Sequence, residues 1–427
     1  MTNSLSKNKV YRTRAAVVCP WTPLSAFDAE ARLRETVDLG AAIDLDVVWS
    51  DIIKLREIRA GSFFGQGVIA RIAEIVSEKE VELLVVDADL TPIQQRNLEK
   101  ELNIKIIDRT ALILEIFGER AQTKEGRLQV ELAHLTYQRS RLVRSWTHLE
   151  RQRGGAGFLG GPGETQIELD RRIIDEKIVK IKKTLEKIKK TRGLQRTARK
   201  KVPYPIVALV GYTNTGKSTL FNRLTQANVF AEDLLFATLD TTMRRLKLPS
   251  GCEIILSDTV GFISDLPHEL IMAFRATLEE VVEADVVIQV LDSGNKDNRQ
   301  QRQDVLEVLH NLGLEQIEYQ NNYIEVYNKI DLVADGSLKF GDKSLPISAL
   351  TGQGCDALLL RLDEVLRRNY KELTINIDAA DGRLWAWLHC HGEIIKSKER
   401  GNMMQITVRL SDADYSRLQN MYEVGLT

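Results

Sequence analysis

The stretch Gly211-Tyr212-Thr213-Asn214-Thr215-Gly216-Lys217-Ser218-Thr219 decides the fold of the central part of the chain. It follows the apolar run Ile206 to Val210 and opens an apolar-periodic segment that contains Leu220, Phe221 and Leu224. This order of strand, glycine loop and helix predicts a P-loop, in which glycines let successive backbone N–H groups point at a phosphate chain. Lys217 supplies a charge for the outer phosphates and Ser218 a hydroxyl for Mg²⁺. The alternative is a glycine turn with a chance lysine.

Two segments further along have the features of nucleotide switches. The first is Phe236-Ala237-Thr238-Leu239-Asp240, in the loop after the P-loop helix. A threonine hydroxyl there can reach Mg²⁺ while a γ-phosphate holds the segment, and Thr238 is the first choice, with Thr241 and Thr242 as alternatives. The second is Asp258-Thr259-Val260-Gly261, which follows the apolar run Ile254 to Leu256. It places a carboxylate near the water shell of the metal and a glycine N–H near the γ-phosphate.

A third pair of segments predicts that the base is guanine. Asn328-Lys329-Ile330-Asp331 follows the predicted strand Ile324 to Tyr327, and Ser348-Ala349-Leu350 follows another strand. The Asp331 carboxylate can accept two N–H bonds from one edge of guanine, a pair that adenine does not offer. Lys329 can lie along the base, Asn328 can bind the P-loop, and the second segment can give a backbone N–H to the guanine oxygen. These elements, in this order, predict GTP and GDP as ligands and resemble the translation-factor-type GTPases.

Two residues of this domain bear on the mechanism of hydrolysis. Phe262 directly follows the second switch motif, where Ras-like proteins carry the glutamine that orients the attacking water. An apolar side chain cannot orient water, so we expect slow hydrolysis that a partner stimulates. Asn214 resembles an asparagine that helps to hold K⁺ near the phosphates in some GTPases, and its alternative role is to cap a turn.

Length and composition set the broad class of the protein. A chain of 427 residues suggests about three or four domains. Its four cysteines lie far apart without a C-x-x-C pair, which argues against disulfides and structural zinc. The amino terminus has no apolar signal segment, and no apolar run approaches the ~20 residues that span a bilayer. We expect a soluble, monomeric, cytoplasmic protein, with loose peripheral membrane association as the alternative.

The first part of the chain, residues 1–118, predicts a small parallel α/β domain. Short β-rich runs alternate there with helical patterns such as Asp28 to Leu39 and Val68 to Ser77. The four runs are Ala15 to Val18, Val47 to Trp49, Leu83 to Val86 and Ile104 to Ile107. Gly65-Gln66-Gly67 before a helix is half of a dinucleotide fingerprint, and it leaves two interpretations open, a turn and a second nucleotide site for ATP.

Residues 119–201 predict an antiparallel helical hairpin. Apolar residues at spacings of four and three form one seam before a glycine-rich break and another after it. The first seam is Leu128, Leu132, Leu135, Leu142, Trp146 and Leu149, and the second is Ile167, Ile174, Ile178, Ile181, Leu185 and Ile188. Arg139 and Arg171 each stand at one seam position where the spacing calls for an apolar residue. The two seams mirror each other about Phe158. We therefore expect each helix to bury its stripe on the other.

The break between the seams, residues 154–164, is far richer in glycine than a helix connection needs. It is either a flexible hinge or a finger that approaches another polymer closely. From residue 151 to residue 201 the chain carries sixteen Lys and Arg against six Asp and Glu, and a basic helix beside such a tip favours RNA over a merely solvated face. The candidate contacts are Arg153, Gly154, Gly155, Phe158, Gly160, Gly161, Pro162, Gly163 and Glu164.

The remaining segments complete a multidomain α/β chain. The GTPase domain is expected over residues 202–370, and residues 371–427 predict a small α+β domain of strand, helix, two strands and helix. Trp385 and Trp387 in that last domain can stack on bases, but such aromatic residues are more often part of a core.

The combination of an N-terminal α/β domain, a coiled arm with GGPGETQIELDRR at its tip, GYTNTGKST, FATLDTT, DTVGF and NKID resembles the HflX family of ribosome-associated GTPases. The resemblance covers about Ala15 to Arg367. It implies binding to the 50S ribosomal subunit near the peptidyl transferase centre and GTP-dependent dissociation of stalled ribosomes under stress. The alternatives are a ribosome-assembly GTPase, an RNA-remodelling protein that also uses ATP, and a signalling switch with a protein target.

Overall fold

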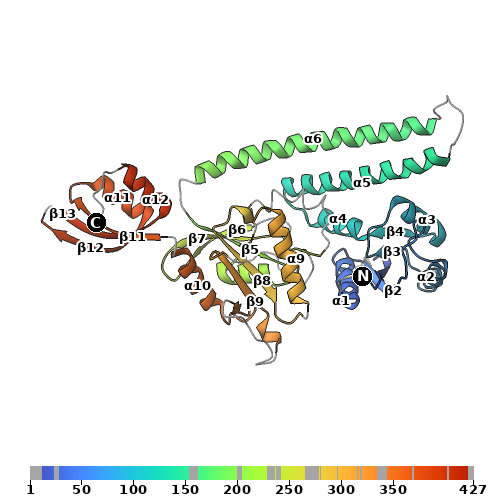
Figure 1. The fold of residues 1–427 in the computed structure, drawn as a ribbon, viewed down its shortest axis with the longest axis horizontal. Helices are drawn as coiled ribbons and strands as arrows, with labels where there is room; N and C mark the ends of the chain where they lie inside the picture. The colour runs from blue at the N-terminus through green and yellow to red at the C-terminus, as the bar shows by residue number, and fades with distance from the viewer. Residues whose placement is uncertain are drawn as a thin grey trace, which may run out of the picture.

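The computed structural model describes residues 12–23, 28–152, 162–199, 204–227, 236, 242–264, 278, 280–295, 297–314, 316–317, 320–333, 344–367, 370–401 and 403–421. Within these residues the chain forms three sheets and a helical hairpin (Figure 1). The N-terminal and C-terminal sheets lie at opposite ends of an elongated molecule, with the largest sheet between them. The hairpin runs along one side (Figure 1).

The N-terminal domain is a parallel four-stranded sheet in the order β2-β1-β3-β4, with helices between the strands. All four β-rich runs form strands, so the predicted parallel α/β domain is confirmed. Its helices begin at residues suited to capping. In the third helix, for example, Thr91 and Gln94 form a capping box around Pro92, the first helical residue. The elements are β1 (Arg14–Trp21), α1 (Ala29–Ala41), β2 (Asp46–Lys54), α2 (Gln66–Glu78), β3 (Leu83–Val86), α3 (Pro92–Leu102), β4 (Lys105–Asp108) and α4 (Arg109–Arg120).

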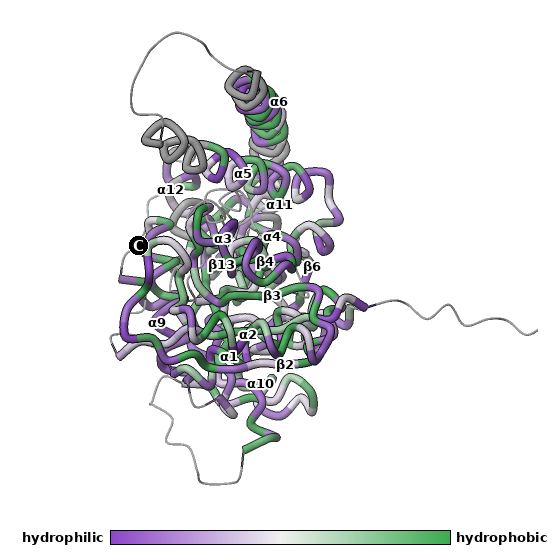
Figure 2. Tube along the Cα trace, turned by 90° about the vertical axis from the view of Figure 1, so that its right-hand side faces the viewer, coloured by the Kyte–Doolittle hydropathy of each residue, from purple (hydrophilic) through white to green (hydrophobic). Residues whose placement is uncertain are grey.

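The hairpin consists of α5 (Lys124–Gln152) and α6 (Pro162–Arg199), which lie side by side (Figure 1). The described middle parts of the two seams meet as predicted, since Leu135, Ile178 and Ile181 are buried together. The side chains of Trp146, Leu149 and Ile167 lie outside the described part of the chain. Arg139, at the position of the first seam where the spacing calls for an apolar residue, pairs with Asp175 of the other helix at 3.0 Å. Figure 2 views α6 nearly along its axis and shows apolar and polar residues on different sides of the helix. The antiparallel hairpin is therefore confirmed.

The central domain has a six-stranded sheet in the order β10-β9-β8-β5-β7-β6, in which only the pairing of β6 with β7 is antiparallel. The parallel strands end at one edge, so the segments that follow β5, β7 and β9 meet there. The elements are β5 (Ile206–Gly211), α7 (Lys217–Thr225), β6 (Thr242–Lys247), β7 (Glu253–Asp258), β8 (Val286–Asp292), α9 (Asn298–Asn311), β9 (Tyr323–Asn328), the 3₁₀ turn η2 (Ile330–Leu332), β10 (Ser344–Pro346) and α10 (Cys355–Arg367).

The C-terminal domain is the predicted small α+β unit, with an antiparallel sheet in the order β11-β13-β12. Trp385 and Trp387 pack against its apolar core, which supports the core interpretation of these two residues. The Trp387 ring also stacks on His391, with 4.5 Å between ring centroids. The elements are β11 (Tyr370–Asp378), α11 (Gly382–His391), β12 (Gly392–Arg400), β13 (Met403–Ser411) and α12 (Asp412–Met421).

The N-terminal and central domains share one apolar cluster, which contains residues of both. Phe117 of α4 meets Phe236 of the central domain edge to face, with ring centroids 4.6 Å apart. Burial of aromatic pairs of this kind stabilises such a contact. Throughout the residues that the structure describes, helices with the length and apolarity to cross a membrane are absent.

Candidate nucleotide site

The two glycines that frame the P-loop stand where no other residue fits. Gly211 ends β5 with φ 153°, and a Cβ there would lie 2.3 Å from the backbone oxygen of Val290. Gly216 starts α7 with φ 88°, and its Cβ would lie 2.3 Å from the side-chain nitrogen of Asn328. Both residues need the conformational freedom and the small size of glycine. The loop therefore lies close against two neighbouring strand ends.

Lys217 is buried beneath this loop. Its Nζ donates hydrogen bonds to the carbonyls of Gly211, at 3.1 Å, and Tyr212, at 2.7 Å. Burial lowers the pKa of Lys217 to about 8, a shift that nearby Asp258 opposes and Lys329 increases. The ammonium group thus lies among carbonyl oxygens that a phosphate can replace as partners.

The residues predicted for Mg²⁺ are partly brought together. Ser218 Oγ donates to Asp258 Oδ2 at 2.6 Å, and Thr242 at the start of β6 lies in register with Asp258. A hydroxyl and a carboxylate are the oxygen ligands that Mg²⁺ takes, so Ser218 and Asp258 fit this ion. Bound Mg²⁺ would neutralise charge on the phosphates. Thr238, Ala237, Leu239, Asp240 and the alternative Thr241 lie outside the described residues.

The second switch motif packs directly on the P-loop. Phe262 N–H donates to the Gly211 carbonyl at 3.0 Å, and Thr213 N–H donates to the Phe262 carbonyl at 2.7 Å. A Cβ on Gly261 would lie 2.9 Å from Thr213 Cα and 3.1 Å from Lys217 Nζ. The Phe262 side chain is 3 % exposed and belongs to the shared apolar cluster. It therefore points away from water, and an orienting role for it is excluded by burial as well as by chemistry.

The segments predicted to bind guanine meet at the end of β9. Asn328 Nδ2 donates to the carbonyl of Thr215 at 2.8 Å, which confirms the predicted link to the P-loop. Asn328 Oδ1 accepts the Ala349 N–H at 2.8 Å. In this structure the Ala349 N–H is therefore bonded to Asn328, whereas the sequence predicted a backbone N–H of this segment as a donor to the guanine oxygen. Asp331 lies exposed on η2, and Lys329 Nζ lies 2.8 Å from Asp292 Oδ2. Ser348 is buried and Leu350 is 69 % exposed at the surface beside them.

Asn214 takes the left-handed conformation, with φ 59°, and its side chain is exposed. Asparagine tolerates this conformation well, so the turn role alone accounts for the residue type. An exposed amide at this position is also accessible to an ion that lies over the phosphates.

Most of the predicted glycine-rich tip lies outside the described residues. Arg153 to Gly161 lie outside the described residues, and Pro162, Gly163 and Glu164 form the first turn of α6 without described side chains.

Sequence reasoning missed a polar network that links the P-loop to the N-terminal domain. The Tyr212 hydroxyl donates to Glu35 Oε1 at 2.9 Å and accepts the Ser264 N–H at 2.7 Å. Arg109 NH2 donates to the same Glu35 oxygen at 3.0 Å and to the Ser264 carbonyl at 3.1 Å. Ser264 lies just after the second switch motif, so this segment bonds directly to Arg109 of the N-terminal domain, and the P-loop is linked to the same arginine through Glu35.

Asp87 anchors this network inside the N-terminal domain. It accepts from Arg32 Nε at 2.8 Å and from Arg109 NH1 at 2.9 Å, and its side chain is fully buried. Burial favours a higher pKa for Asp87, but Arg109 and Arg32 together hold the pKa below its ordinary value. Asp87 follows β3 and Arg109 follows β4, at adjacent strand ends of one sheet edge, which is the sequence signal that could have indicated their contact.

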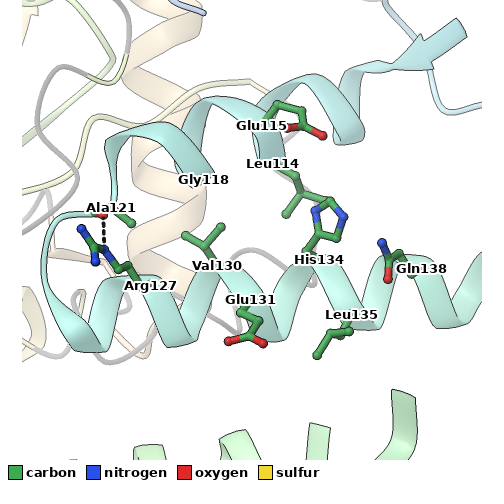
Figure 3. Close-up of a pocket in the computed structure, with 10 residues that line it drawn as sticks. All are labelled: Leu114, Glu115, Gly118, Ala121, Arg127, Val130, Glu131, His134, Leu135 and Gln138. Carbon is green, nitrogen blue, oxygen red and sulfur yellow. Dashed lines mark hydrogen bonds between the residues drawn. The ribbon is translucent and has the colours of Figure 1, made fainter. Parts of the chain in front are cut away.

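A pocket of about 370 Å³ lies apart from the nucleotide site, between α4 and α5 (Figure 3). Arg127 Nε donates to the Ala121 carbonyl at one end of it, at 3.1 Å (Figure 3). It is lined by Leu114, Glu115, Gly118, Ala121, Arg127, Val130, Glu131, His134, Leu135 and Gln138. The segment Gly65-Gln66-Gly67 also lies apart from the nucleotide site, since Gly65 caps α2 eleven residues after β2 ends. Neither Gly65 nor Gly67 has a positive φ or a close backbone neighbour.

Three family models match consecutive parts of the chain. They are described as GTP-binding GTPase N-terminal, over residues 30–118, GTP-binding GTPase Middle Region, over residues 120–199, and 50S ribosome-binding GTPase, over residues 206–329. GTPase HflX of Magnetococcus marinus is 47 % identical over 416 residues, which cover 96 % of this chain and 95 % of that protein. GTPase HflX of Escherichia coli is 42 % identical, over 83 % of this chain and 84 % of that protein.

A solved GTP-binding protein from Sulfolobus solfataricus, in complex with GDP, is similar with a TM-score of 0.44 and 23 % identity, over 83 % of this chain and 99 % of that one. The fold and its loops, with the matching models, define a P-loop GTPase. At 47 % identity over nearly the whole length, the chain belongs to the HflX GTPase family.

Proposed function

We propose that this GTPase depends on Mg²⁺ and binds the 50S ribosomal subunit through its helical hairpin. We further propose that it uses GTP to dissociate or rescue stalled ribosomes under stress. Its turnover is slow alone, because the buried, apolar Phe262 stands where Ras-like proteins carry the water-orienting glutamine, and contact with the ribosome stimulates it.

The charge on the outer face of α6 carries this proposal. Between residues 177 and 190 the helix has seven lysines and one glutamate, and all of them are exposed. The apolar side of the same helix is buried against α5, so the lysines form a continuous basic strip along the arm. Such a strip suits the phosphates of RNA, and the similarity to a 50S ribosome-binding GTPase model supports ribosomal RNA as the partner.

The position of α5 supports a link between arm and nucleotide. Tyr137 on α5 donates to Asp108 Oδ1 at 2.8 Å, and Arg141 on α5 pairs with the same carboxylate. Asp108 adjoins Arg109, which binds Ser264 beside the second switch motif. A short chain of contacts therefore joins the arm to the loops that face the γ-phosphate.

Co-sedimentation with 50S subunits tests the proposal. With a non-hydrolysable GTP analogue we expect binding that weakens with salt, and a variant with Lys182, Lys183 and Lys187 changed to Gln should show a shallower salt dependence, by roughly two to three units of the log–log slope. A matched variant with Lys79, Lys100 and Lys105 of the N-terminal domain changed to Gln should keep the wild-type slope. Deletion of residues 154–163 should abolish binding. Co-sedimentation that is the same with and without the GTP analogue would contradict the ribosome proposal.

The assembly alternative has the same chemistry with an rRNA precursor as target. Splitting of purified 70S ribosomes by the chain with GTP would favour rescue. Binding to precursor particles without splitting would favour assembly.

A second site for ATP in the N-terminal domain is the other alternative, and Gly65 and Gly67 are its support. At the carboxyl edge of that sheet, where open α/β sheets bind ligands, Asp87 and Asp108 are engaged by arginines. Lys217→Ala should abolish both GTP and ATP hydrolysis if the P-loop is the single site. Surviving ATPase activity would favour the second site.

We also propose that K⁺ binds beside Asn214 as a substitute positive charge. Hydrolysis should then be faster in K⁺ than in Na⁺, and Asn214→Ala should remove the difference while it leaves the rate in Na⁺ nearly unchanged. Equal rates in both salts would count against the ion.

A further inference from the structure

The Thr213 side chain places a buried hydroxyl in the P-loop without a hydrogen-bond partner among the described residues. Thr213 is 5 % exposed, and its Oγ1 has no partner in the part of the chain that the structure describes. Neighbouring hydroxyls differ, since Thr215 Oγ1 donates to the Tyr212 carbonyl at 3.0 Å and Thr259 Oγ1 to the Leu209 carbonyl at 2.6 Å. An unsatisfied buried hydroxyl costs free energy, so its retention points to a partner that arrives with the ligand.

The location of Thr213 identifies that partner. A Cβ on Gly261 would lie 2.9 Å from Thr213 Cα, 2.9 Å from Thr213 Cγ2 and 3.1 Å from Lys217 Nζ. Thr213 therefore lies where the second switch motif meets the P-loop lysine, the place that the outermost phosphate takes in a P-loop site. The methyl and hydroxyl of threonine share one Cβ, so a rotation about χ1 brings the hydroxyl to the position of the methyl.

We infer that Thr213 is a catalytic residue whose hydroxyl donates a hydrogen bond to an oxygen of the γ-phosphoryl group of GTP. This inference rests on the GTPase activity of the family and not on the ribosome. Water attacks the γ-phosphorus, the bond to the β–γ bridging oxygen breaks with its electron pair left on GDP, and the proton of the water passes to inorganic phosphate. The hydroxyl holds the γ-phosphoryl group in line for this attack, where the buried side chain of Phe262 contributes no donor.

The bond to the γ-phosphoryl group has a consequence for nucleotide discrimination. GDP lacks this group, so the hydroxyl stays unpaired in the GDP complex and contributes nothing to GDP affinity. Loss of the hydroxyl should therefore weaken GTP analogues and slow hydrolysis without a change in GDP binding.

The test measures single-turnover GTP hydrolysis in Mg²⁺ without ribosomes, together with affinities for GDP and for a non-hydrolysable GTP analogue. Thr213→Val keeps the shape and removes the hydroxyl, so hydrolysis should slow at least tenfold and the GTP analogue should bind at least fivefold more weakly. Thr213→Ser should stay within threefold of the wild type. GDP affinity should stay within twofold in both variants.

Thr225→Val is the matched control, because it removes a hydroxyl from α7, the helix that follows the P-loop, and this hydroxyl bonds to the Phe221 carbonyl at 2.7 Å. Its hydrolysis should stay within twofold of the wild type. Wild-type hydrolysis by Thr213→Val would overturn the inference. So would Thr213→Ser as slow as Thr213→Val, or a loss of GDP affinity that equals the loss for the GTP analogue, since either would indicate a role in loop shape alone.

Discussion

Nucleotide binding should weaken as pH rises through the pKa of Lys217, which burial lowers to about 8 from its ordinary value of 10.5. This shift corresponds to a cost of about 3 kcal/mol for holding the charge without a phosphate. Below pH 8 the unliganded protein carries the ammonium that phosphates need, and above it the amine is neutral. Binding at alkaline pH therefore requires the uptake of a proton.

The magnitude follows from the fraction of unliganded protein in the charged form. With a pKa of about 8, that fraction falls from about nine-tenths at pH 7 to about one-tenth at pH 9, so the Kd for GDP should rise about tenfold. The free energy of unfolding of the unliganded protein, by contrast, increases with pH. The unfolded chain binds more protons at Lys217 between pH 8 and 10.5, so unfolding becomes less favourable as pH rises through that window.

Calorimetric titration with GDP at pH 7, 8 and 9, in two buffers of different ionisation enthalpy, measures both the affinity and the proton uptake. Guanine also loses its N1 proton at alkaline pH, and Lys217→Arg separates the two effects because its guanidinium does not titrate in this range. The slope of log Kd against pH should be shallower in that variant. A Kd that is flat from pH 7 to 9, without proton uptake, would refute the reasoning.

Four substitutions test the packing of the glycines, the buried carboxylate and the arm. Gly211→Ala brings a Cβ within 2.3 Å of a β8 carbonyl and should lower the free energy of unfolding, measured in urea, by about 2–3 kcal/mol. The control Gly67→Ala in α2 meets nothing within 4 Å and should raise that free energy by about 0.5–1 kcal/mol. Equal effects of the two substitutions would contradict the geometry. Asp87→Ala removes the buried carboxylate that Arg32 and Arg109 share and leaves Arg109 with Glu35, so it should cost about 3–5 kcal/mol. A neutral result would mean that the network is not formed. Tyr137→Phe removes the bond to Asp108, so α5 should become more sensitive to proteolysis, with a loss of about 1–3 kcal/mol; unchanged cleavage would argue against this anchor.

The sequence predicted those parts of the fold that depend on local patterns. The hairpin is a clear case, because the residues that mirror each other about Phe158, such as Leu135 and Ile181, are buried together. The four N-terminal strands and the P-loop follow in the same way from runs of apolar residues and glycine spacing. Even the link from Asn328 to the P-loop could be predicted from its place after a strand.

The contacts between domains were beyond such reasoning. Arg32 and Ser264 are separated by 232 residues, and Tyr212 and Glu35 by 177 residues, and no periodicity relates them. Tyr212 has an ordinary place within a phosphate loop, so its second role as a partner of the N-terminal domain leaves no mark in the motif. The motif likewise does not reveal that the Thr213 hydroxyl is buried without a partner among the described residues, because this depends on the hydrogen bonds of the folded loop.

The two helices of the arm have separate supports, and this makes the arm a lever. The helix α5 is bound to the N-terminal domain through Asp108, whereas α6 leads directly towards β5 and the P-loop. With 29 residues, α5 is about 43 Å long, and packed helix axes lie about 9 Å apart. If the two domains move so that the helices slide by about 1.5 Å, one residue's rise, the arm tilts by about 10° and its far end travels about 7 Å. A slide of about 1.5 Å between the two helices, which is shorter than a hydrogen bond to a phosphate, thus moves the far end of the arm by about 7 Å, a distance comparable to the spacing between neighbouring phosphates of an RNA strand.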